Sequence, residues 1–134
     1  MAGRLLLVDM NSTNQVQQIL PNSFTESSRS ALISTTEPVF VPDKTYRFRA
    51  FRVGRPLGLN KVLAVVVPKD FPVGSLVDRQ SRSASISNVE QPAGYLMNLT
   101  NEVKDYIAKK KAAAAETSAP LPHWSMAVLE YKIE

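Results

Sequence analysis

The chain has 134 residues and a net charge of +4 at neutral pH, with 44% hydrophobic and 21% charged residues. This length suits one compact domain, and the composition is close to that of average globular proteins, which argues against a wholly disordered chain. The absence of cysteine excludes disulfides, thiolate zinc sites and cysteine nucleophiles. The longest apolar runs, 5–8 and 62–67, are far shorter than the ~20 residues of a membrane-spanning helix, and we therefore expect a soluble protein.

The first part of the chain is predicted to form a β-hairpin. Residues 4–10 contain the apolar run Leu-Leu-Leu-Val, which favours a strand covered on both faces. Turn-forming residues follow at 11–14, and a second strand over 16–20 stops at Pro21, because proline cannot continue a ladder. Within the turn, Asn14 is the residue best able to take a left-handed backbone conformation.

The middle of the chain is predicted to add four more strands. Residues 31–34 and 37–43 favour short strands, and prolines confine the second one to a sheet edge. Aromatic residues alternate with arginines over 46–53, which indicates a half-buried strand that bends at a bulge after Ala50. Residues 61–67 are apolar on both faces, which predicts a central strand ended by the following proline.

The last third of the chain carries the only predicted helix. A polar segment at about 78–94 is expected to be a mobile loop, and a helix follows at about 97–115 with Asn98 or Thr100 as its cap. Apolar residues recur there at helical spacing, namely Leu96, Leu99, Val103, Tyr106 and Ile107. The three lysines at 109–111 are expected near the negative end of the helix dipole.

The chain ends in a predicted strand over 123–133, in which Trp124, Met126 and Val128 alternate with residues of the other face. This strand is expected to return to the sheet. Together these elements predict one domain over 1–134 that is mainly β with one amphipathic helix late in the chain. Strands in antiparallel succession with short turns favour an antiparallel β-sandwich, immunoglobulin-like in architecture.

Arginines provide the candidate binding residues. Arg47 and Arg49 lie on one face of a predicted strand, Arg52 and Arg55 follow closely, and such rows can hold carboxylates or phosphates. The alternative interpretation, which we favour, is that they keep one face of a sheet solvated. A second basic group lies in the serine-rich loop, and its arginines are Arg79 and Arg82. That loop resembles a kinase target or a partner-binding segment, although we favour a plain surface loop.

Catalytic patterns are absent from the sequence. The single histidine, His123, has no histidine partner for a metal, and the aspartates are scattered without the spacing of a calcium loop or an acid–base pair. No serine lies in a glycine-flanked nucleophile elbow, and no glycine-rich loop could cradle a nucleotide phosphate. We therefore expect neither catalysis nor a bound cofactor or metal.

With these elements in place, residues 4–73 resemble a bacterial family of unknown function. The pattern is a strand ending in Asp9, a strand closing on Pro21-Asn22, a short strand before Pro42, and an aromatic strand leading through a Pro-x-Gly turn at 56–58 into an apolar strand. Members of that family occur as C-terminal accessory domains of caspase-like peptidases and on other envelope or signalling proteins. The resemblance implies a β-sandwich that binds or positions something and carries no active site to transfer.

Three functional hypotheses follow from the sequence. The leading one is a non-catalytic interaction or accessory module that binds a protein, and its sheet edges would also allow homo-oligomers to form. The second is a basic protein whose arginine strand engages nucleic acid or an anionic polymer, although no recognition helix or exposed aromatic cluster supports nucleic acid. The third is a hydrolase with a site built from loops. The compartment, bacterial cytoplasm or cell envelope, would depend on any parent sequence.

Overall fold

The computed structural model describes residues 2–21, 32–34, 38, 40–41, 56–72, 87–89 and 92–134. These residues form six strands and one helix. In chain order the elements are β1 (Ala2–Met10), β2 (Val16–Leu20), β3 (Leu32–Ser34), β4 (Gly58–Pro68), β5 (Ser87–Val89), α1 (Pro92–Thr117) and β6 (Ser125–Ile133).

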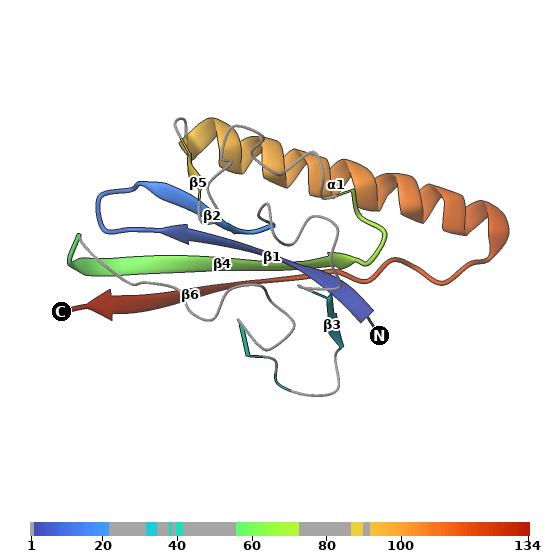
Figure 1. Ribbon diagram of the computed structural model, residues 1–134. Coiled ribbons are helices and arrows are strands. Elements are labelled where there is room, and N and C mark those ends of the chain that lie inside the picture. The colour runs from blue at the N-terminus through green and yellow to red at the C-terminus, as the bar shows by residue number, and fades with distance from the viewer. Residues whose placement is uncertain are drawn as a thin grey trace.

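The strands form one antiparallel sheet in the order β5-β2-β1-β4-β6, and β3 pairs separately with the start of β1. Figure 1 shows α1 running along the sheet before the chain reverses into β6. β4 pairs with β1 on one side and with β6 on the other, so the prediction of a central apolar strand over 61–67 is confirmed. Among the described strands, β5 and β6 are therefore the two edges of the five-strand order.

A hydrogen-bonded turn joins β1 to β2. The side-chain oxygen Oδ1 of Asn11 accepts bonds from the backbone N–H groups of Thr13 and Gln15, at 3.0 and 2.9 Å. Asn14 adopts a φ of 62°, as predicted, because asparagine tolerates the left-handed region better than most residues. The turn is tied to β4 by Ser12, whose N–H donates to Oδ1 of the buried Asn60 at 3.1 Å.

Each face of the sheet carries an apolar cluster. On the face covered by α1, called here the helix face, the buried residues are Leu6, Val8, Val16, Val65, Val67, Phe71, Leu99, Val103 and Ile107. On the opposite face, Leu5, Ile19 and Leu20 are buried, and Leu7, Ile33, Val41, Ala64 and Val66 pack against them. The near-continuous apolar runs of β1 and β4 thus supply both faces, as expected for central strands.

Helix α1 is longer at both ends than the 97–115 expected from the sequence. It begins at Pro92. Proline suits the first helical position because it has no N–H, and an N–H at that position would have no intrahelical partner. The predicted caps are wrong, since Asn98 and Thr100 lie inside the helix and the Thr100 hydroxyl donates to the Leu96 carbonyl at 2.8 Å. The helix continues to Thr117 because four alanines at 112–115 favour helix strongly.

Two related expectations also need correction. The predicted loop over 78–94 contains β5 and the start of α1, so part of it is regular structure. β5 forms because β2 offers its outer side for pairing over residues 16–18, and tertiary pairing overrides the low strand propensity of Ser-Asn. The lysines at 109–111 are not at the end of α1, whose last turn holds no basic residue.

The mainly β fold with one late helix is confirmed, as are the strands predicted at 4–10, 16–20, 31–34 and 123–133. The sandwich requires a second sheet, and the described strands form one sheet, so the sandwich stays a prediction. The strand predicted over 46–53 lies outside the described residues, as does most of the one over 37–43. No helix of the described residues has the length and apolar character to cross a membrane.

Candidate binding groove and sheet edge

The edge strand β6 is the most exposed apolar element of the described chain. Met126, Val128 and Leu129 are 61%, 60% and 67% exposed, and Trp124 just before the strand is 48% exposed. Residues that pair across antiparallel strands share a face, so Met126 opposite Val65 and Val128 opposite Leu63 lie on the helix face. Leu129, opposite Val62, lies on the other face. β6 thus presents uncovered apolar side chains on both faces.

The exposure of β6 follows from the position of α1. The buried stripe of the helix, Leu99, Val103 and Ile107, packs over β1 and β4. Towards β2, the hydroxyl of Tyr95 donates to Oε1 of Gln18 at 2.6 Å, which ties the helix to that side of the sheet. Burial raises the pKa of Tyr95, and the Glu102 charge adds to the rise, so this donor stays protonated. The helix therefore does not reach over β6.

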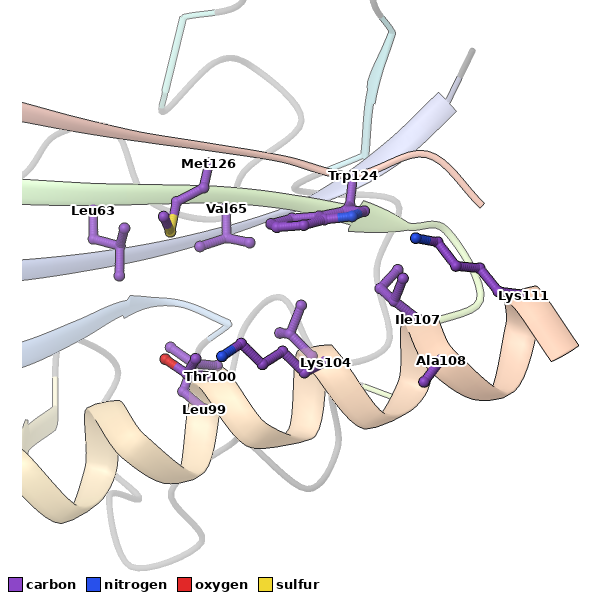
Figure 2. A pocket seen from close by; sticks show the side chains of 11 residues that line it. Leu63, Val65, Leu99, Thr100, Lys104, Ile107, Ala108, Lys111, Trp124 and Met126 are labelled. Carbon is purple, nitrogen blue, oxygen red and sulfur yellow. The ribbon is translucent and has the colours of Figure 1, made fainter. Parts of the chain in front are cut away.

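A hollow of about 340 Å³ remains between α1 and β6, and we call it the β6 groove. Its apolar lining consists of Leu63, Val65, Leu99, Val103, Ile107, Trp124 and Met126, and its helix side is completed by Thr100, Lys104, Ala108 and Lys111. Figure 2 shows Met126 of β6 and the preceding Trp124 on the side of β6 that faces the helix, next to Leu63 and Val65 of β4. The volume lies at the lower end of the range for small-ligand pockets.

The charges of the β6 groove are all positive. Lys104 and Lys111 are the only charged residues of its described lining, and both are exposed. Neither makes an ion pair with any residue that the structure describes. The positions three and four residues away on α1, where a helical partner would lie, hold alanine, threonine, asparagine and isoleucine. The groove therefore combines an apolar interior with two cations that lack a helical counter-charge.

A second hollow, of about 440 Å³, lies where β4 ends and the chain approaches β6. It is lined by Pro68, Lys69, Asp70, Pro120, Leu121, Pro122 and His123. Asp70 is already engaged, because it forms an ion pair with Lys110 that lowers the pKa of the carboxyl group. Within the described ranges no three His, Cys, Asp or Glu side chains are placed to hold a metal ion. Prolines and a paired carboxylate make this hollow a weaker candidate than the β6 groove.

Arg47, Arg49, Arg52, Arg55, Arg79 and Arg82 all lie outside the described residues, so their role as binding residues stays a prediction. Most residues of the β6 groove were instead predicted as parts of the central strand, of the helix and of the last strand, without a binding role. One signal in the sequence could have revealed them: Lys104 and Lys111 flank the apolar stripe of α1 without acidic partners at helical spacing.

Comparison with protein families gives a match over the first part of the chain. The model of a domain of unknown function, DUF4384, matches residues 2–70, just over half of the chain. The chain belongs to this family. No curated protein and no solved structure matches the chain. The DUF4384 match covers β1 to β4 and stops before α1 and β6.

The β6 groove spans the boundary of the DUF4384 match. Leu63 and Val65 lie inside the matched region, whereas the helix residues, Trp124 and Met126 lie beyond it. The groove is thus built by adding α1 and β6 to the matched strands. Among the described residues, its lining is apolar apart from Thr100, Lys104 and Lys111.

Proposed function

We propose that this domain is a non-catalytic interaction module that binds a protein segment along β6 and over the β6 groove. The observation that carries the proposal is the uncovered apolar edge: a nine-residue strand, paired on one side among the described strands, beside an apolar hollow. An edge strand offers free backbone N–H and C=O groups that a second extended segment can pair with. Monomeric soluble proteins rarely leave such an apolar edge uncovered unless it serves an interaction.

The resemblance to accessory domains of caspase-like peptidases supports the same proposal, because such domains position a partner and leave the chemistry to another domain. Family membership adds no catalytic residue, since DUF4384 has no assigned function. The proposed role is therefore to hold a protein partner, with specificity set by side chains that enter the β6 groove.

Site-specific photo-crosslinking tests the proposal. A photoreactive residue is placed at Met126, at Leu129 or, as a control away from the groove, at Lys109, which is exposed on α1. In an extract of the source cells we expect defined protein adducts from positions 126 and 129 and none from 109. Val128→Lys, which puts a charge on the edge, should abolish those adducts. Adducts that are equal at all three positions, or absent from 126 and 129, would contradict the proposal.

A second candidate function is binding of an acidic partner through the arginine-rich segment. The net charge of +4 supports it, as do the two lysines of the groove that have no counter-charge among the described residues. Binding of this kind weakens steeply with salt, because condensed counterions are released on association. A titration with single-stranded nucleic acid and with an anionic polymer at rising salt therefore separates it from apolar edge binding, which salt affects little.

A further inference from the structure

The sequence of β6 is suited to pair with itself. We propose that a second copy of this chain binds the edge, its β6 antiparallel to the first about a two-fold axis at Ala127. The inference rests on the proposed function and names the partner of that same site. Over residues 125–129, a sheet that continues across the two copies would pair the free backbone groups of both edges, which is the usual self-complementary form of a two-fold interface.

The register follows from the apolar pattern. With Ala127 opposite itself, Met126 lies opposite Val128 of the second copy, and Ser125 lies opposite Leu129 of the second copy. The two residues of each pair are an even number of positions apart in the sequence, so they lie on the same face of β6. The helix face of one copy therefore continues into the helix face of the other. The two α1 helices then lie on the same side of the joined sheet, and the open sides of the two β6 grooves face each other. The exposed Met126 and Val128 of both copies become contiguous.

The same register brings opposite charges together. Glu130 of the second copy falls opposite Trp124, at the end of the groove where Figure 2 shows the Lys111 side chain reaching towards the indole. Lys111 has no acidic partner among the described residues, so it is available for this carboxylate. Glu130 also pairs with Lys61 of its own chain at 3.2 Å, and a carboxylate has acceptor sites for both cations. The two-fold axis repeats the Lys111–Glu130 contact, giving two such pairs per dimer.

A charge swap between two variants tests this register. Lys111→Glu and Glu130→Lys each place like charges at both contacts, so each variant alone should dimerise at least about tenfold more weakly than the wild type. Mixed together, the two variants restore opposite charges at both contacts, one of them reversed in polarity, and a heterodimer should form in preference to either homodimer. Sedimentation velocity over a concentration series measures all three, and Lys109→Glu on the same helix is the matched control for charge. Thermal melts establish that every variant folds.

The expected result is a wild-type and Lys109→Glu dimer, two weakened single variants, and recovery in the mixture. A wild type that stays monomeric at high concentration overturns the inference. So does a dimer whose affinity is unchanged by the Lys111 and Glu130 substitutions, or a mixture of the two variants that forms no heterodimer. The crosslinking assay separates this failure from that of the proposed function. If the chain is monomeric but positions 126 and 129 give adducts to another protein, the proposed function holds and only the partner differs. If the chain is monomeric and these adducts are absent, both the proposed function and the dimer are contradicted.

Discussion

At the scale of single residues, one hydrogen bond crosses three strands. The hydroxyl of Tyr131 on β6 donates to Oδ1 of Asp9 on β1 at 2.7 Å, and the bond passes over β4, which lies between them. Burial, and after it the bond to Asp9, raises the pKa of Tyr131 to about 12. The contact fixes the end of β6 far from Trp124, so it helps to hold the exposed edge in place.

Removing this hydroxyl in Tyr131→Phe should lower the free energy of unfolding by about 1 kcal/mol near neutral pH, because the Asp9 carboxylate loses a donor. A raised pKa means that the contribution is fully present below the ordinary tyrosine value of 10 and is lost as the pH rises through about 12. Urea unfolding of both proteins at neutral pH and between those two values measures the effect. A difference that does not shrink at high pH would show that the hydroxyl contributes in another way.

At the scale of elements, α1 is attached to the sheet at both ends by different contacts. Tyr95 bonds to β2 near the start of the helix. Towards its end, Tyr106 packs edge-on against Phe71 with ring centroids 5.0 Å apart, and Lys110 pairs with Asp70 and lies 5.5 Å from the Tyr106 ring. Asp70 and Phe71 closely follow β4, so these contacts fix the helix along the strand that forms the floor of the β6 groove.

The Asp70–Lys110 pair should make the stability of this attachment depend on pH. Lys110 lowers the pKa of Asp70 from its ordinary 3.8, so the contribution is present above 3.8 and is lost as the pH falls through the lowered value. Asp70→Asn should therefore lower the melting temperature slightly at neutral pH, since both side chains are about half exposed and solvent screens the pair. The melting temperatures of the two proteins should become equal at pH values below the lowered pKa of Asp70. A difference that stays constant with pH would mean that the substituted amide packs badly.

Elements also show which parts of the fold the sequence can predict. The spacing of Leu99, Val103 and Ile107 identifies the helix because periodicity is a property of the segment itself. Its ends were missed, since Pro92 and the four alanines act through local geometry that is also compatible with a loop or a frayed end. Alternation identified β6 but gave no sign of its exposure: the pattern tells which residues share a face, whereas cover depends on where α1 lies.

At the scale of the whole molecule, the DUF4384 match and the folded core do not coincide. Residues 2–70 contain β1 to β4, yet Leu99, Val103 and Ile107, which bury the helix face, come from beyond the match. β4, central in the full chain, would become an exposed edge if β6 were absent. The second half of the chain therefore completes the core as well as building the β6 groove.

This dependence predicts that residues 1–72 alone will not fold. Burying one apolar side chain contributes roughly 1.5–3 kcal/mol, so the loss of Leu99, Val103 and Ile107 costs roughly 5–9 kcal/mol, comparable to the whole stability of a small domain. We expect the fragment to show no cooperative thermal transition by circular dichroism and to aggregate through the uncovered β4, whereas the full chain melts cooperatively. A monomeric fragment with a sharp transition would mean that the matched strands are self-sufficient and that α1 and β6 serve binding alone.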